Sequence, residues 1–300
     1  MVKFSRTIDI FEFNSNLGLR EQRGKQPYVK NFPCWLKQYG FYDIIKPRKI
    51  IKLIPPDYQM KFDSHSGILN ENAVLDYALN QKKILQNEFQ SDTFKLIIGG
   101  DCSILLGNAA ALKEKGIYGL FFLDGHTDYT NEQISDTKAV AGMDLAITTG
   151  WGSKKLTNIE NLSPYFQQQN VYCVGNKESD SQYITPILQS NIHYFDLEKV
   201  RLVGPSKISN LFLNDILNQP GLDGFFVHFD VDVFAGEIMP AVDSPGTAGL
   251  SYIEVLEILA PLIHNEKCVG MEITIFDPSL DPDGEIVKPF IAHISKLFTD

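Results

Sequence analysis

Short hydrophobic runs alternate with longer amphipathic stretches along most of the chain. The runs are rich in β-branched and aromatic residues, and they predict strands at residues 50–54, 94–98, 117–123, 171–174, 224–229 and 268–275. Helices are predicted between them, at residues 73–89, 103–115 and 252–264. Strands that are apolar on both faces are typical of a parallel sheet that helices cover on both sides. The pattern therefore predicts an α/β fold with a mainly parallel central sheet.

The last of these helices has a recognisable start signal. Ser251 precedes it and Glu254 follows three residues later, which is the capping-box pattern. Loops are predicted at residues 131–141, which are polar and lack periodicity, and at residues 277–284, which are rich in turn-forming residues. We expect the first loop to lie over a functional site. Because no linker, low-complexity tract or repeat interrupts the alternation, residues 1–300 are expected to form a single domain.

Composition and charge narrow the possible classes of function. Of the 300 residues, 44% are hydrophobic and 21% are charged, which is ordinary for a globular protein with a sizeable core. The formal net charge of −10 argues against a nucleic-acid partner, because no basic excess is available to neutralise phosphates. No apolar run is long enough to span a membrane, and the charged start does not resemble a signal peptide. The four cysteines lie far apart without C-x-x-C spacing, so we expect a cytoplasmic protein with reduced thiols.

Residues that can bind metal ions gather in three short segments, each directly after a predicted strand. The segments read GGDCS at residues 99–103, DGHTD at 124–128 and DVD at 230–232. In open parallel sheets, ligand sites form beyond the carboxyl ends of the strands. Residues two apart in extended backbone point to the same side, so the side chains within a segment can converge. We expect all three segments to meet at one edge of the sheet.

Crowded carboxylates at this edge would repel one another unless they were protonated or neutralised by a cation. Oxygen-rich donors with one imidazole suit Mn²⁺, and bridging carboxylates suit a pair of divalent ions. The alternative is that these aspartates only form turns at strand ends, as a lone Asp-x-Asp often does. Two such motifs that both follow hydrophobic strands favour a metal site.

Taken together, the motifs resemble those of the ureohydrolase family, which includes arginase, agmatinase and formimidoylglutamase. The family signatures are GGDHS, DAHxD and SFDxDxxDP…P…TPxxGGL. The corresponding segments here are GGDCS, DGHTD and, at residues 228–252, HFDVDVFAGEIMPAVDSPGTAGLSY. A further segment, GMDLA at residues 142–146, is similar to the family's HGMPLA. Order and separation agree over roughly residues 95–285, and three ordered motifs make a specific signal.

The resemblance implies a three-layer α/β/α sandwich and a binuclear Mn²⁺ site whose bridging hydroxide attacks a guanidinium carbon. The metal ligands implied at matching positions are Cys102, Asp124, His126, Asp128, Asp230 and Asp232. Asp128 is also the implied donor of a proton to the departing amine, which must not leave as an anion. The family further implies a small guanidino-type substrate and a homo-oligomer, a trimer or hexamer.

Two positions beside the expected metals depart from the family pattern. Cys102 stands where the family has a histidine ligand. A thiolate is softer than imidazole and favours Zn²⁺ or Fe²⁺, so one ion or another divalent metal could replace the Mn²⁺ pair. Alternatively, Cys102 stays a thiol, or is a small buried hydrophobe. A cysteine here is similar to a family branch that acts on hydroxyguanidino compounds such as hydroxyarginine. His228 replaces a small serine, and we expect it to orient a ligand or pack rather than bind metal.

Residues that would contact the substrate also differ. The family's SGNxHG loop reads TKAVAG at residues 137–142, so Ala141 replaces a histidine. The glutamate that holds the guanidinium would fall at Ile275. Glu272, three residues earlier, would replace it only if the backbone shifts register, because it belongs to the opposite strand face. Asp180 matches a family acid near the substrate's amino group.

These observations predict a hydrolase that splits a C–N bond in a linear guanidino, hydroxyguanidino or formimino compound. A second hypothesis is a catalytically inactive arginase-fold protein that binds a ligand or partner, because a histidine ligand and the substrate loop are altered. Five unaltered ligand positions argue against it. A deacetylase-like amide hydrolase fits the GGDCS and SPGTAGL segments less well.

Overall fold

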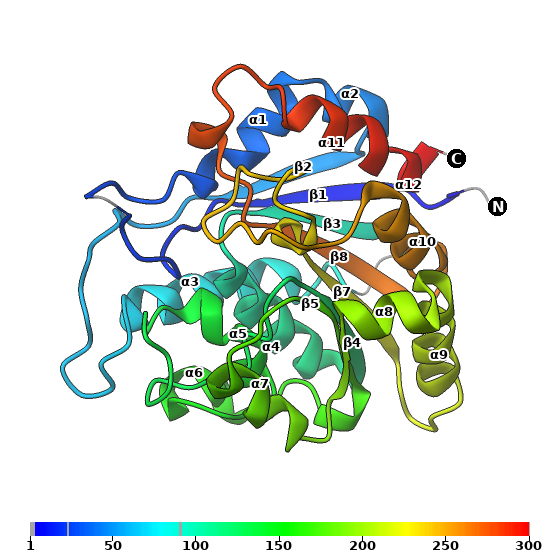
Figure 1. Ribbon diagram of the computed structural model, residues 1–300. Coiled ribbons are helices and arrows are strands. Elements are labelled where there is room, and N and C mark those ends of the chain that lie inside the picture. Colours follow the sequence, from blue (N-terminus) through cyan, green and yellow to red (C-terminus); the bar gives the residue numbers. More distant parts are fainter. Residues whose placement is uncertain (1–3, 23, 90–91, 300) are drawn as a thin grey trace.

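The computed structural model describes residues 4–22, 24–89 and 92–299, and in this part of the chain the strands form one eight-stranded sheet (Figure 1). Every pair of neighbouring strands is parallel, and their order is β2-β1-β3-β8-β7-β4-β5-β6. The strands are β1 (Ile8–Phe13), β2 (Lys49–Leu53), β3 (Phe94–Gly99), β4 (Tyr118–Leu123), β5 (Val171–Asn176), β6 (His193–Asp196), β7 (Gly224–Asp230) and β8 (Cys268–Thr274). The predicted mainly parallel sheet is confirmed.

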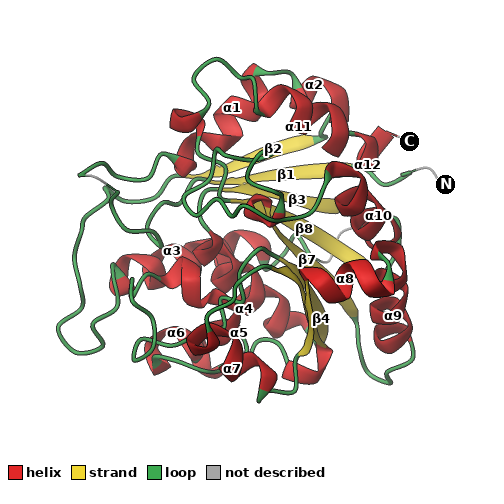
Figure 2. Cartoon of the chain, in the orientation of Figure 1, coloured by secondary structure: helices red, strands yellow, loops and turns green. Residues whose placement is uncertain are grey.

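Helices cover both faces of this sheet (Figure 2). One layer packs on the larger hydrophobic cluster and consists of α1 (Phe32–Gln38), α2 (Phe41–Ile45), α8 (Leu197–Val203), α9 (Pro205–Leu217), α10 (Tyr252–Ile263), α11 (Val287–Ile294) and α12 (Lys296–Thr299). The other layer consists of α3 (Glu71–Leu85), α4 (Leu105–Lys115), α5 (Asp144–Thr148), α6 (Lys154–Thr157) and α7 (Ser181–Leu188). The three-layer α/β/α sandwich implied by the resemblance is therefore confirmed.

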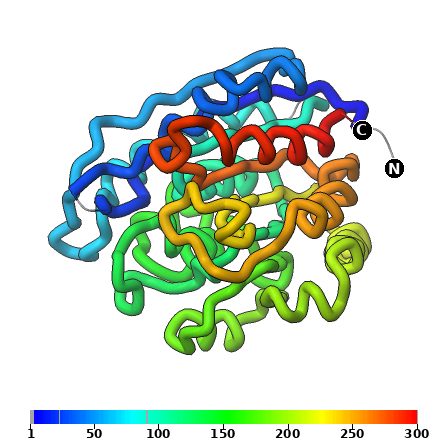
Figure 3. Tube along the Cα trace, turned by 45° about the horizontal axis from the view of Figure 1, so that its top comes forward, coloured from blue at the N-terminus to red at the C-terminus, as the bar shows by residue number. Residues whose placement is uncertain are grey.

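The central strands form as predicted because almost every side chain in them is apolar and buried. All positions of β3, β4, β5 and β7 are buried, as expected for strands covered on both faces. Near the sheet's edge, the ring of Phe4 contacts that of Phe298 at 5.5 Å between centroids, so the two ends of the described chain lie side by side (Figure 3).

Two strands were not predicted. The β1 sequence IDIFEF contains two acids, Asp9 and Glu12, and both are buried. Arg48 reaches Asp9 at 2.6 Å, and the hydroxyl of Tyr42 donates to Glu12 at 3.1 Å, so each acid has a partner from another element. The other missed strand, β6, has four residues and lies at the edge of the sheet, where no buried apolar pattern is required.

The start signal of α10 is confirmed. Ser251 Oγ accepts a hydrogen bond from the Glu254 backbone N–H, and the Glu254 carboxylate accepts one from the Ser251 N–H at 2.8 Å. The predicted loop at residues 131–141 is irregular up to a short 3₁₀ helix, Val140–Met143. The second predicted loop, 277–284, contains a 3₁₀ helix at Pro278–Leu280. None of the helices in the described ranges is long and apolar enough to cross a membrane.

The sheet order brings the three ligand-bearing segments together. They follow β3, β4 and β7, which with β8 form the four adjacent central strands. Gly100, directly after β3, allows this segment to pack closely on its neighbour. A Cβ atom at Gly100 would lie 1.6 Å from the carbonyl oxygen of Ser15, closer than any two such atoms can approach.

We predict that Gly100→Ala destabilises the protein by about 2–3 kcal/mol, because the backbone must move to admit the added methyl group. Gly142→Ala is the matched control, since a Cβ there has no heavy atom within 4 Å and its φ is negative. Denaturant unfolding of both variants measures the effect. Equal stability of the two variants would show that the close contact at Gly100 does not constrain this segment.

Candidate metal centre

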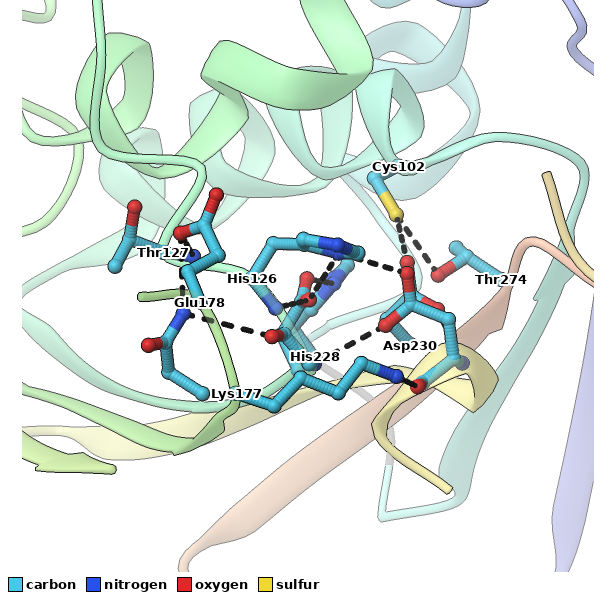
Figure 4. Close-up of polar contacts among 12 residues, drawn as sticks. Cys102, His126, Thr127, Lys177, Glu178, His228, Asp230 and Thr274 are labelled. Atoms are coloured by element: carbon cyan, nitrogen blue, oxygen red, sulfur yellow. Dashed lines mark hydrogen bonds and ion pairs between the residues drawn. The ribbon is translucent and has the colours of Figure 1, made fainter. Parts of the chain in front are cut away.

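Donor atoms from the three segments meet in one buried cluster (Figure 4). Asp124 follows β4 directly, Asp230 ends β7, and Cys102 begins a 3₁₀ helix after β3. Three sets of side chains each place their donor atoms within 4.8 Å of one another. The sets are Cys102 with Asp124, His228 and Asp230; Cys102 with Asp128 and Asp144; and Asp124 with His126 and Asp232. The predicted convergence at one edge of the sheet is therefore observed for all six expected ligands.

Hydrogen bonds within local turns orient the carboxylates of Asp124 and Asp230. Asp124 Oδ1 accepts from the His126 backbone N–H at 2.6 Å, and Asp230 Oδ1 accepts from the Asp232 N–H at 2.7 Å. Asp124 Oδ2 is left without a hydrogen-bond partner among the described residues. Turn formation and metal binding are thus compatible roles for one aspartate, because each role uses a different oxygen.

His126 is held at the mouth of the cluster by Asp232. Its Nδ1 lies 2.8 Å from Asp232 Oδ2 and 3.8 Å from Asp124 Oδ1. The negative charge of Asp232 raises the pKa of His126 to about 10. Burial acts to lower this pKa, but its effect is smaller. Burial acts to raise the pKa of Asp232, but the nearby His126 outweighs it and the pKa of Asp232 is lowered. The raised pKa of His126 and the lowered pKa of Asp232 both favour an ion pair between the two groups.

The remaining acids lack enough positive charge to ionise together. Burial first, and neighbouring acids second, raise the pKa values of Asp128 and Asp230 well above normal. For Asp144, burial is again the main cause of a pKa well above normal, and for Asp124 it raises the pKa. A divalent cation would reverse this effect by stabilising the carboxylates.

Several buried donor atoms in the described structure have no hydrogen-bond partner: Asp124 Oδ2, both oxygens of Asp144, and His228 Nε2. Unpartnered buried polar atoms are costly in a folded protein and call for a specific explanation. Here they converge on one place from separate elements. The donor set therefore fits divalent metal ions.

Cys102 faces the acids rather than only the apolar core. Its side chain is 1% exposed, and Sγ lies 2.9 Å from Asp230 Oδ2 and 3.1 Å from Thr274 Oγ1. Burial, followed by the Asp230 charge, raises the pKa of the thiol well above normal. Metal coordination would have the opposite effect, since a coordinating thiol loses its proton.

A cavity of about 480 Å³ opens directly over the cluster. Five of the six expected ligands line it: Cys102, His126, Asp128, Asp230 and Asp232. Its wall also includes Glu178, Tyr183 and Asp243, and the predicted loop at 131–141 contributes four lining residues. The expected position of this loop over the site is observed. A larger, more open hollow lies elsewhere, against Trp151, and holds none of these ligands.

Glu272 stays on the strand face away from the cavity, so the register shift that a substrate role would require is not seen. It is 0% exposed and is not one of the described residues that line the cavity. Its carboxylate lies against His228 Nδ1 at 2.5 Å and accepts from Asn108, because Glu272 on β8 is in register with His228 on β7. The pairing of β7 with β8 is regular from Glu272 to Thr274, and the next residue, Ile275, whose φ is +78°, lies on the cavity wall itself. The geometry thus argues against direct substrate contact by Glu272.

Asp180 also lies away from the cavity. It is exposed, and its carboxylate accepts from the Gln182 backbone N–H at 2.9 Å as the N-cap of α7. Glu178, two residues earlier, lines the cavity instead and accepts from the Thr127 N–H at 3.0 Å. The divergent residues around Asp180 contain no pattern that would have identified Glu178.

Two side chains of the cluster, Asp144 and His228, were not among the expected ligands. Asp144 stands where the family's HGMPLA segment has proline, so an acid replacing proline was the available signal. His228 was expected to orient a ligand or to pack rather than bind metal, and in the structure its Nε2 faces the cluster. Both become apparent only when β7, α5 and the segment after β3 are placed together.

Comparison with known proteins gives a matching family model, and curated relatives and solved structures that are similar over most of the chain. The family model described as the arginase family matches residues 57–297. The arginase of Brevibacillus brevis is 27% identical over 266 residues, which is 88% of this chain and 87% of that protein. The structure of arginase from Bacillus caldovelox has a TM-score of 0.86 at 21% identity, covering 99% of each chain. That of formimidoylglutamase from Bacillus subtilis has a TM-score of 0.69 at 16% identity, covering 97% of this chain and 85% of that one.

Proposed function

The chain belongs to the arginase family, and from this premise we propose that it is a metal-dependent hydrolase that splits a C–N bond in a linear guanidino, hydroxyguanidino or formimino compound. The observation that carries the proposal is the buried cluster of acids, imidazole and thiol beneath a cavity large enough for a small substrate. Relatives named arginase and formimidoylglutamase support the same reaction class.

We propose two divalent ions, with Mn²⁺ the family's metal. One would be held by Asp124, His126 and Asp232, and the other on the side of the cluster that contains Cys102. When bound, such ions lower the pKa of coordinated water so that a nucleophile exists near neutral pH. Because Asp124 belongs to both sets of donors, its carboxylate would contribute to holding both ions.

The protein's own groups would complete the reaction. Asp128 lines the cavity and lies next to Asp144 and Cys102, so its carboxyl group faces both the cluster and the substrate space. We propose that Asp128 carries the proton to the departing nitrogen, which is a poor leaving group as an anion. Glu178 and Asp243 add negative charge to the cavity wall and would favour a cationic guanidino group.

Substrate selection is expected to differ from that of arginases. Ala141 stands on the cavity wall where the family's loop has a histidine, and it offers no hydrogen bond to the substrate. Ile275 presents an apolar surface where the family has the glutamate that holds the guanidinium. Because the sheet is continuous, we propose that residues 1–300 act as one domain. From the family, we further propose that the protein is a cytoplasmic homo-oligomer.

Metal removal tests the proposal. We expect the purified protein, supplied with Mn²⁺, to release urea, hydroxyurea or formamide from one member of a panel of guanidino, hydroxyguanidino and formimino compounds. Treatment with a chelator should abolish turnover, and added Mn²⁺ should restore it, because the acids of the cluster cannot activate water alone.

The same assay distinguishes an enzyme from the second hypothesis, a catalytically inactive protein that binds a ligand or partner. A metal-loaded protein that turns over no member of the panel, while still binding one of them in the cavity, would support a binding protein. Turnover that persists in the presence of chelator would contradict the metal-dependent mechanism.

A further inference from the structure

His228 is a buried histidine whose free ring nitrogen faces the cluster. It lies on β7, is 0% exposed, and its Nε2 has no hydrogen-bond partner in the described structure. The same Nε2 lies 3.6 Å from Asp124 Oδ2. It shares a set of donor atoms, all within 4.8 Å of one another, with Cys102, Asp124 and Asp230.

Three neighbouring elements fix the orientation of this ring. Phe122 on β4 stacks on it in parallel, with 4.3 Å between ring centroids and 9° between the planes. On the other side, Glu272 on β8 lies 2.5 Å from His228 Nδ1, and its second carboxylate oxygen accepts from Asn108 on α4 (Figure 4 shows His228 beside Asp230). With Nδ1–H donating to Glu272, Nε2 is left to face the donor atoms of Cys102, Asp124 and Asp230.

This arrangement is the one that metal-binding histidines use. A carboxylate that accepts from one ring nitrogen fixes the tautomer and makes the other nitrogen a better donor. The other nitrogen of His228, Nε2, makes no hydrogen bond in the described structure; its contact with Asp124 Oδ2 is an ion-pair approach at 3.6 Å, longer than a hydrogen bond. An unused, fully buried ring nitrogen is costly unless something else binds it.

We propose that His228 Nε2 is a metal ligand and replaces the imidazole that position 102 lacks. With Cys102 Sγ and carboxylate oxygens of Asp124 and Asp230, it forms a four-donor site at the Cys102 side of the cluster. Glu272 and Asn108 act as positioning residues for the ring. The inference rests on the proposed function only in taking the cluster as the metal centre.

The donor types determine which ion this position prefers. One thiolate, one imidazole and two carboxylates form a mixed set that suits Zn²⁺, which takes four such ligands, better than Mn²⁺. The neighbouring set of Asp124, His126 and Asp232 has no sulfur and suits Mn²⁺. The protein would therefore carry two positions of different metal preference that share Asp124.

Zinc binding and X-ray absorption test the assignment. The metal-free full-length protein is loaded with one equivalent of Zn²⁺, and the absorption edge is expected to show both sulfur and imidazole neighbours. In His228→Ser, which introduces the family's residue, the sulfur should remain and the imidazole should be lost. Zinc affinity should fall more than about 100-fold, since even residues that only orient a ligand are worth about 10- to 100-fold.

Two further variants control the result. His264→Ser removes a histidine that bonds the Leu297 carbonyl far from the cluster, and it should leave zinc affinity and spectrum unchanged. Glu272→Gln should lower zinc affinity by about 10- to 100-fold while retaining the imidazole neighbour, which marks a positioning residue. If His228→Ser fails to fold, His228→Gln, which fills more of the space, gives the same absorption measurement.

The outcomes separate this inference from the proposed function. If His228→Ser keeps the zinc affinity and imidazole signal of the unaltered protein, or zinc binds without sulfur, the assignment of His228 is wrong while a hydrolase with other ligands remains. A protein that binds no divalent ion would overturn both. Loss of imidazole with sulfur retained supports the assignment whatever the substrate is.

Discussion

Replacement of Asp124 by alanine should abolish C–N bond hydrolysis. Asp124 belongs to two of the three sets of donor atoms, is 0% exposed, and has one oxygen without a partner in the described structure. Its loss would remove a ligand from both proposed metal positions. We expect turnover to fall roughly 1,000-fold or more, because several kcal/mol of transition-state stabilisation is lost and each ~1.4 kcal/mol is tenfold in rate.

Metal content should change together with the rate. Elemental analysis of Asp124→Ala after mild purification should show fewer ions per chain than in the unaltered protein. The matched control is Asp196→Ala, since Asp196 caps α8 by accepting from the Lys199 N–H and lies outside the cluster. It should lose about 1 kcal/mol of stability and keep its metal. Full activity of Asp124→Ala would contradict the role of the cluster.

Replacement of Cys102 by histidine should raise the affinity for Mn²⁺ by at least about tenfold, because imidazole suits this ion better than a soft thiolate. Sγ already lies 2.9 Å from Asp230, so a donor at this position faces the cluster. Mn²⁺ titration followed by electron paramagnetic resonance measures the change, and Cys102→Ala, which provides no donor, is the control.

The opposite outcome is equally informative. If Cys102→His lowers the melting temperature without changing Mn²⁺ affinity, then the side chain at 102 only fills space, as buried cysteines often do. A gain in Mn²⁺ affinity with a loss of Zn²⁺ affinity would instead show that sulfur sets the metal preference at this position.

Most of the sheet could be predicted from the sequence because its central strands are buried on both faces. The run of β4 is followed by its first acid only at Asp124, and that of β7 has His228 as its only polar residue before Asp230, so a hydrophobic pattern was sufficient. The pattern failed for β1, where Asp9 and Glu12 are buried in a strand. Their partners Arg48 and Tyr42 come from later in the chain, and only the fold brings them together.

The metal cluster was predictable for a related reason. The carboxyl ends of parallel strands lie at one edge of a sheet. The polar segments after β3, β4 and β7 therefore converge there, independently of how the helices pack. The placement of Glu272 was not predictable, because it depends on the register of β8 against His228 on β7. The cavity position of Glu178 likewise depends on the turn after β5, which sequence spacing does not describe.

A crystal structure with anomalous scattering from the bound metals tests the central claim most directly. We expect one ion held by Asp124, His126 and Asp232, and a second beside Cys102, with Asp124 contacting both. Anomalous peaks elsewhere in the molecule, or none within reach of these side chains in protein crystallised with metal present, would contradict this expectation.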